Sequence, residues 1–144
     1  MTKSIRTEII IQASKEKVWN ILTDFSAYPA WNPFLIRIEG KLIAGGRLRN
    51  TMLNGSRQFV IMPVIQRVVP TEYFDWIGHI WVKGIFDGHH YFELEDLGSG
   101  QVKLTQGEHF SGLLSGYIFK KIAEDTRANF IKMNQAVKKL AQQV

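Results

Sequence analysis

The residues with the clearest potential for chemistry are a histidine and a glutamate, His90 and Glu108. Both lie in segments where polar and apolar residues alternate, as in half-buried strands. If a hairpin is centred on Gly98, His90 pairs with Gln106 and Glu108 lies diagonal to His90. A diagonal pair is roughly 7 to 8 Å apart between backbones, so an imidazole can reach a carboxylate. This pair could act as acid and base or polarise a ligand hydroxyl. The alternative is that the two groups only satisfy each other's hydrogen-bonding needs, or those of a water, in a half-buried sheet face.

The other histidines do not converge on that face. The alternation predicts that His89 points outward, and His79 and His109 lie on strands whose parity is outward or undecided. Metal ligands must meet on one face, and the chain has no cysteine to supply a thiolate. We therefore expect no metal and no other cofactor.

The two strands that carry the pair are predicted to share an inward face. On the first strand this face comprises Phe86, Gly88, His90, Phe92 and Leu94, and on the second Val102, Leu104, Gln106, Glu108 and Phe110. Asp87 and the other alternate residues then face outward, because successive side chains of a strand point to opposite sides. An aromatic and apolar wall with a few polar groups is the expected setting of the pair.

A long amphipathic helix is predicted from about Ser115 to Val144. Its apolar face, at 100° per residue, comprises Ile118, Ile122, Phe130, Met133, Val137, Leu140 and Val144. Six lysines and arginines point away from that face: Lys120, Lys121, Arg127, Lys132, Lys138 and Lys139. Asp125 and Asn129 lie at the edge of the apolar face, where they could address the polar end of a ligand or form a solvated rim. A helix of about 45 Å needs a broad apolar surface to cover.

The preceding sequence supplies that surface as strands. Alternating or apolar runs predict strands at 4–12, 35–39, 47–53, 58–69 and 73–81, in addition to the two described above. The run 58–69 is apolar on both parities, which we interpret as a bulge at Pro63. A helix capped by Ser14 and a turn or second short helix at 28–34 follow the first strand. We predict one α+β domain, 1–144, with about seven strands in a curved antiparallel sheet.

Composition narrows the classes of function. The net charge is +5, but the basic residues are scattered or lie on the back of the helix, so we do not expect nucleic acid as a partner. Peripheral contact of this basic face with an anionic membrane is an alternative that the sequence does not exclude. The start of the chain lacks the apolar core of a signal peptide, and no apolar run approaches the roughly 18 residues of a membrane span. We expect a cytoplasmic protein, monomeric or homodimeric.

The order of these elements resembles the helix-grip fold of the START-like (SRPBCC) superfamily, which includes Bet v 1 allergens, lipid-transfer START domains and bacterial polyketide cyclase/dehydrase-type proteins. The resemblance covers the whole chain. It is carried by Ser14, Val18-Trp19, Asp24, Tyr28-x-x-Trp31-Asn32-Pro33-Phe34, Gly40, Gly45-Gly46, Phe74-Asp75-Trp76-x-Gly78, Gly84-x-Phe86-x-Gly88-x-His90-x-Phe92-x-Leu94 and Glu108-x-Phe110-x-Gly112-Leu113-Leu114. It implies a cavity between the curved sheet and the long helix that receives an apolar or aromatic small molecule.

Three hypotheses of function follow, and the first is favoured. The chain binds a hydrophobic small molecule such as a lipid, a polyketide or an aromatic metabolite. Alternatively it is a cyclase or dehydratase that uses His90 and Glu108, with help from Tyr73 or Tyr117, or a protein-interaction module of the chaperone-activator type. The candidate ligand-binding residues are Trp31, Phe34, Trp76, Phe86, His90, Phe92, Glu108, Phe110, Phe119 and Phe130. Core packing is the alternative for the aromatic members.

Overall fold

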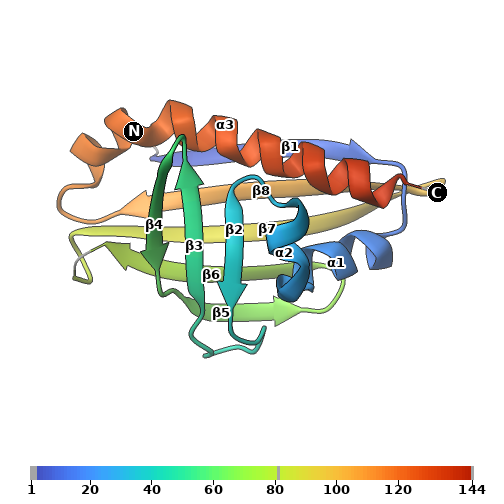
Figure 1. The fold of residues 1–144 in the computed structure, drawn as a ribbon, viewed down its shortest axis with the longest axis horizontal. Helices are drawn as coiled ribbons and strands as arrows, with labels where there is room; N and C mark the ends of the chain where they lie inside the picture. Colours follow the sequence, from blue (N-terminus) through green and yellow to red (C-terminus); the bar gives the residue numbers. More distant parts are fainter. Residues whose placement is uncertain (1–2, 81, 144) are drawn as a thin grey trace.

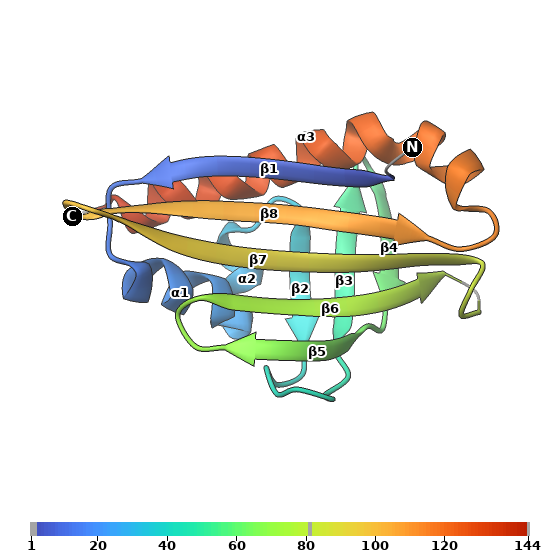
Figure 2. The ribbon, with the colours of Figure 1, turned by 180° about the vertical axis from the view of Figure 1, so that it is seen from behind.

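Two antiparallel sheets and a long helix make up the fold. The computed structural model describes residues 3–80 and 82–143. The larger sheet has the order β1-β8-β7-β6-β5 (Figure 2). Its strands are β1 (Ser4–Ile11), β5 (Val64–Val69), β6 (Tyr73–Ile80), β7 (Phe86–Gly98) and β8 (Gln101–Ser111). The smaller sheet has the order β2-β3-β4 and consists of β2 (Leu35–Glu39), β3 (Arg49–Asn54) and β4 (Arg57–Ile61).

The long helix α3 (Ser115–Ala141) lies along the upper edge of both sheets in Figure 1, and the strands of the smaller sheet cross those of the larger one. Three short helical segments link β1 to β2: α1 (Lys15–Thr23), a 3-10 turn (Phe25–Ala27) and α2 (Tyr28–Trp31). They lie beside the C-terminal end of α3 (Figure 1). The predicted helix-grip plan, α+β with short helices after the first strand, is therefore confirmed.

Local sequence explains these elements. The side chain of Ser14 accepts a hydrogen bond from the backbone N–H of Lys17 and so caps α1. On α3, Phe130, Met133 and Val137 are buried as the apolar periodicity requires, while Lys120 on the opposite side is exposed. Val144, the predicted end of that face, and Trp81, the predicted end of β6, lie outside the described residues. None of the helices described is long and apolar enough to span a membrane.

The predicted bulge at Pro63 is wrong. Residues 57–61 form β4 in the small sheet, and residues 64–69 form β5 in the large one. The chain changes sheets at Pro63, whose missing N–H cannot continue a ladder. Phe59 and Ile61 of the first half line the cavity and Ile65 of the second half is buried, whereas Val60 and Met62, the apolar residues of the other parity, are exposed. The carbonyl of Pro63 instead accepts a bond from the N–H of Leu48, which ties the two sheets together.

The predicted register of the β7–β8 hairpin is also wrong, by two residues. His90 lies directly opposite Glu108, and Gln106 lies opposite Phe92. The reason is the turn. Ser99 and Gly100 both have positive φ, 55° and 75°, as the central residues of a tight hairpin turn do. The turn is therefore centred between Ser99 and Gly100, and the irregularity between Asp96 and Gly98 leaves the pairings beyond it, such as His90 with Glu108, two residues from the predicted register.

Candidate functional site

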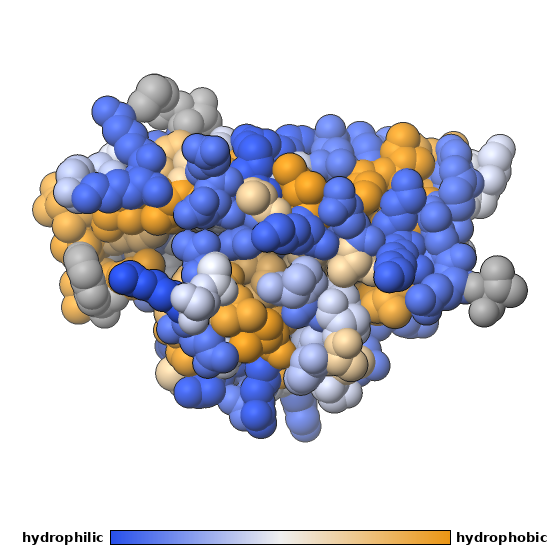
Figure 3. Space-filling view, turned by 45° about the horizontal axis from the view of Figure 1, so that its top comes forward, coloured by the Kyte–Doolittle hydropathy of each residue, from blue (hydrophilic) through white to orange (hydrophobic). Residues whose placement is uncertain are grey.

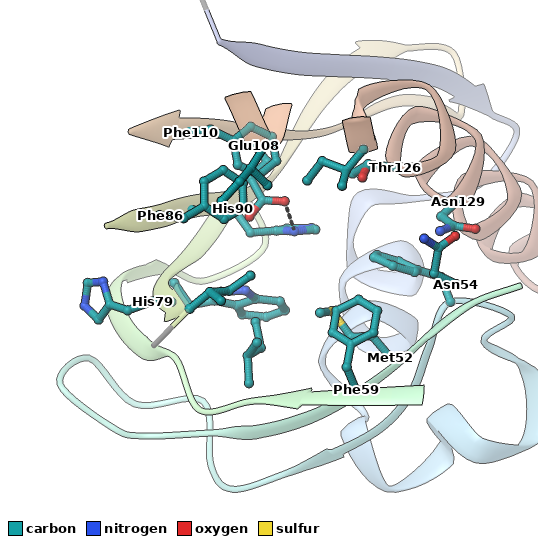
Figure 4. A pocket seen from close by; sticks show the side chains of 18 of the residues that line it. Met52, Asn54, Phe59, His79, Phe86, His90, Glu108, Phe110, Thr126 and Asn129 are labelled. Atoms are coloured by element: carbon teal, nitrogen blue, oxygen red, sulfur yellow. Dashed lines mark ion pairs between the residues drawn. The ribbon is translucent and has the colours of Figure 1, made fainter. Parts of the chain in front are cut away.

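A cavity of about 280 Å³ lies between the two sheets and the first half of α3. Its walls come from β3 and β4 of the small sheet, β6, β7 and β8 of the large sheet, and α3 (Figure 4). This volume is near the lower end of the roughly 300 to 1,000 Å³ typical of small-molecule sites. The lining is mostly apolar, with a few polar side chains on opposite walls.

Six of the ten candidate binding residues line this cavity: Phe34, Trp76, Phe86, His90, Glu108 and Phe110. The inward alternation of β7 and β8 places four of them side by side. The rings of Phe86 and Phe110 stack at a centroid distance of 5.3 Å, and Trp76 stacks on His90 at 5.1 Å. The result is a continuous aromatic wall around one buried imidazole.

The other four candidates lie outside the lining. Trp31 packs edge-on against Tyr28, and Phe92 stacks on Phe74 deeper in the core. Phe119 lies behind Phe110, with ring centroids 5.4 Å apart. Phe130 is fully buried. Phe92, Phe119 and Phe130 contact lining residues from outside the cavity, whereas Trp31 packs away from the lining.

The β3–β4 hairpin contributes cavity residues that were not predicted. Met52, Asn54, Arg57, Phe59 and Ile61 all line the cavity. The alternation of Met52 and Asn54 was a usable signal, because residues two apart on a strand share a face. The break at Pro63 concealed it by making β4 look like part of a longer strand.

Polar groups face the cavity from two sides. Figure 4 shows His90 and Glu108 together on one wall, and Asn54 and Asn129 pointing toward each other on the other. Asn129 was predicted at the edge of the helix face and does line the cavity, whereas its predicted companion Asp125 is exposed and does not. A mostly apolar ligand with a polar group at each end could thus form hydrogen bonds with both walls.

The His90–Glu108 pair is close but not directly bonded. Nδ1 of His90 lies 3.6 Å from Oε1 of Glu108, longer than the roughly 2.7 to 3.2 Å of an N–H···O hydrogen bond. The His90 side chain is only 5% exposed and the Glu108 side chain 17%. The other ring nitrogen, Nε2, lies 3.0 Å from Oε1 of Gln106. Nε2 of His90 thus faces Gln106 in the protein interior, and Nδ1 faces the Glu108 carboxylate.

Glycine at position 88 makes room for the glutamate. Gly88 lies beside the His90–Glu108 pair on β7, and a Cβ there would fall inside the contact distance of the Glu108 carboxylate, with Cδ at 3.2 Å. The carboxylate therefore rests directly over the backbone of β7. Any side chain at Gly88 would displace the carboxylate from this position.

The remaining histidines lie on the outer face or the rim. His89 Nε2 is 2.6 Å from Oδ2 of the buried Asp75, and its ring stacks with His109. Tyr73 donates to the same carboxylate at 2.9 Å; burial and this bond raise the pKa of its hydroxyl. Tyr73 does not line the cavity, so the hypothesis that it assists His90 is wrong. Tyr117 is 64% exposed and does not line it either.

His79 marks the rim of the cavity. Its Nδ1 lies 2.7 Å from Oδ1 of Asp87, and its ring points away from the cavity in Figure 4. Burial disfavours the charged carboxylate, but the hydrogen bonds from His79 and the Gly84 N–H outweigh it, so the pKa of Asp87 is lowered. Apolar surface gathers at the same end of the molecule, where α3 begins (Figure 3). It includes Leu113.

Comparison with known proteins identifies the family. The family described as "Polyketide cyclase / dehydrase and lipid transport" matches residues 2–144. The chain belongs to this family. The comparison with curated proteins gives no match. Family and fold together are those of a polyketide cyclase-type protein with the helix-grip plan.

Solved structures share the fold at low sequence identity. An aromatase/cyclase, Zhui from Streptomyces sp. R1128, aligns with a TM-score of 0.79 at 14% identity over 99% of this chain and 94% of that one. A START superfamily protein from Mycobacterium smegmatis aligns with a TM-score of 0.71 at 19% identity, over 95% of this chain and 97% of that one. A hypothetical protein from Helicobacter pylori aligns with a TM-score of 0.80 at 15% identity, over 96% of this chain and 88% of that one. At these identities the likeness is one of fold.

Proposed function

We propose that this polyketide cyclase/dehydrase-family protein binds a small, largely aromatic molecule in the cavity between its sheets and α3. The observation that carries the proposal is the cavity itself, about 280 Å³ of mostly apolar space walled by Trp76, Phe86 and Phe110. Such walls favour a flat apolar ligand through buried area and ring stacking. The volume suits a ligand of a few fused rings rather than a two-chain lipid.

The test is direct binding with a matched pair of variants on α3. Ile118 lines the cavity, whereas Ile131 on the same helix is 42% exposed. Calorimetric titration with 2-methoxynaphthalene, anthraquinone and palmitate should show binding of at least one aromatic probe. Ile118→Trp should lower that affinity at least tenfold by filling the space, and Ile131→Trp should leave it unchanged. Failure of every probe to bind, or equal effects of both variants, contradicts the proposal.

The His90–Glu108 pair favours a second candidate, an enzyme of cyclase or dehydratase type. Nδ1 of His90 or the carboxylate of Glu108 would remove a proton from the carbon next to a ketone, and the pair would then pass that same proton to the departing β-hydroxyl. A carbon–carbon double bond forms and water leaves, so charge and atoms balance. This reaction requires two proton-transfer groups on one wall, and His90 Nδ1 and Glu108 Oε1 lie there 3.6 Å apart.

The enzyme candidate is tested with a β-hydroxy ketone that bears an aryl group, whose dehydration produces a conjugated product visible in ultraviolet absorbance. Glu108→Gln and His90→Asn should abolish turnover while calorimetric binding of the substrate persists. Absence of turnover above buffer, or full turnover in both variants, rejects the enzyme candidate and leaves the binding proposal unaffected.

A further inference from the structure

A continuous chain of buried polar side chains runs behind the cavity wall. It begins at Thr7 on β1, passes through Asn134 on α3 and Gln106 on β8, and ends at His90 on β7. The four residues are more than nine-tenths buried. Three of them do not touch the cavity, so the function proposed above does not require them. Apolar residues would normally fill such positions unless the polar groups satisfy one another.

The direction of this chain is fixed by the backbone. The hydroxyl of Thr7 donates to the carbonyl oxygen of Gln106 at 2.8 Å, and a carbonyl can only accept. The Thr7 oxygen therefore uses a lone pair to accept from Nδ2 of Asn134, at 2.8 Å. Oδ1 of Asn134 then accepts from Nε2 of Gln106 at 2.7 Å, and that nitrogen also lies 3.4 Å from the carbonyl oxygen of Phe130.

This direction decides the tautomer of His90. With its nitrogen turned to Asn134, Gln106 presents its oxygen Oε1 to Nε2 of His90 at 3.0 Å. An amide oxygen can only accept, so Nε2 must carry a hydrogen. A neutral imidazole has one N–H, which leaves Nδ1 as a bare acceptor. Nδ1 is the atom that lies 3.6 Å from Glu108 Oε1.

We propose that Thr7, Asn134 and Gln106 are positioning residues that hold neutral His90 as its Nε2–H tautomer, so that the wall recognises a phenol or enol hydroxyl at Nδ1. The proposal rests on the binding function above and names its ligand class. In this tautomer, Nδ1 of His90 and the carboxyl oxygen of Glu108 place two acceptors at one spot. A hydroxyl there satisfies one of them by donating its hydrogen, whereas an ether or ketone brings a third acceptor.

The surroundings suit an aryl hydroxyl in particular. The His90 ring contacts Trp76, at 5.1 Å, and Phe130, at 4.8 Å between ring centroids, and these contacts hinder its rotation. Phe86 and Phe110 continue the aromatic wall next to the pair. A ring that stacks on this wall would direct a hydroxyl substituent at the two acceptors. The fixed imidazole makes this contact specific rather than adaptable.

The tautomer is tested by long-range ¹H–¹⁵N correlation on ¹⁵N-histidine-labelled protein at a pH where His90 is neutral. His90→Asn assigns the signal among the four histidines. The wild type should show the Nε2–H pattern. Thr7→Val removes the hydroxyl that fixes the direction of the hydrogen-bond chain, at a site separated from His90 by Asn134 and Gln106, and should shift His90 toward mixed tautomers. Thr7→Ser keeps the hydroxyl and should retain the wild-type pattern. An Nδ1–H signal in the wild type, or no change in Thr7→Val, overturns the proposal.

The ligand class is tested by calorimetry with 2-naphthol and its methyl ether, 2-methoxynaphthalene. The wild type should bind 2-naphthol at least tenfold more tightly. This preference should fall to within about twofold in Thr7→Val and in Gln106→Leu, and persist in Thr7→Ser. Equal affinity of both probes for the wild type overturns this inference while upholding the binding function, whereas absence of binding by either probe contradicts both.

Discussion

The position of the Glu108 carboxylate depends on the absence of a side chain at Gly88. We predict that Gly88→Ala weakens binding of 2-naphthol several-fold, because the new methyl group displaces the carboxylate from the space beside His90. The thermal unfolding midpoint should change little, since the displaced group is the far end of a flexible side chain. Titration calorimetry and a melting curve measure the two effects.

A double-mutant cycle provides the control for Gly88→Ala. In a Glu108→Ala background no carboxylate remains to be moved, so adding Gly88→Ala should have no further effect on affinity. Additive losses in the cycle would show that Gly88 acts by another route. The prediction about the glutamate would then be wrong.

Tyr28 provides a prediction for alkaline pH. Burial, with the charge of nearby Asp24, raises the pKa of its hydroxyl, which donates to the carbonyl of Leu22. A pKa that is higher in the folded state means stability is intact below the unfolded value of about 10 and falls as pH rises above it, by up to about 1.4 kcal/mol per pH unit. Urea unfolding from pH 9 to 11 should show this decline.

Two tyrosine variants separate this effect from the titration of other groups. Tyr28→Phe should be less stable by about 1 kcal/mol at pH 7, from the lost hydrogen bond, and should show a shallower decline between pH 9 and 11. Tyr117→Phe should follow the wild type, because that side chain is 64% exposed. A wild-type slope in Tyr28→Phe would show that the decline arises elsewhere.

At the level of the elements, α3 has two roles along its length. Its first half lines the cavity through Ile118 and Ile122, and its second half fills the core through Phe130 and Met133. Phe130 sits at the junction, with its ring centroid 5.7 Å from that of Phe34. The helix is therefore held firmly at one end and borders open space at the other.

We predict that Phe130→Ala lowers the free energy of unfolding by about 3 to 5 kcal/mol, the usual range for a fully packed phenylalanine. The ring is fully buried and does not line the cavity, so no existing void reduces the cost. Ile131→Ala, one residue along and exposed, should change the free energy by less than about 0.5 kcal/mol. Urea denaturation of both variants measures the difference, and a small loss for Phe130 would mean that the cavity extends to its ring.

The amino-acid sequence predicts the elements better than their partners. Alternation on β7 and β8 correctly placed His90 and Glu108 on the inner face, because that pattern is local. The register was wrong because it depends on the backbone conformation of Ser99 and Gly100, which residue types alone leave open. The link from Thr7 to His90 joins residues far apart in the chain, and no local pattern could reveal it.

At the scale of the whole molecule, the cavity exists because two sheets cross without closing on each other. Within the part of the chain that the structure describes, α3 and short connections bridge the space, and one of these connections is the bond between Leu48 and Pro63. β4 pairs with β3 alone and is largely exposed, so the small sheet is expected to be the less stable part of the fold. Its hairpin nevertheless provides Met52 and Phe59 to the cavity.

A ligand in the cavity should therefore stabilise the small sheet most. It would contact Met52 and Phe59 on one side and Trp76 on the other, and so add bridges where the protein has few of its own. We predict that saturating 2-methoxynaphthalene slows amide hydrogen exchange in residues 49–61 several-fold. Exchange in β8, already paired on both sides by β1 and β7, should change much less. Mass spectrometry of peptides from the two regions measures this, with Ile118→Trp as the control that should show no ligand effect. Equal protection of both regions would indicate global stabilisation rather than bridging, and protection confined to another surface would place the ligand outside the cavity.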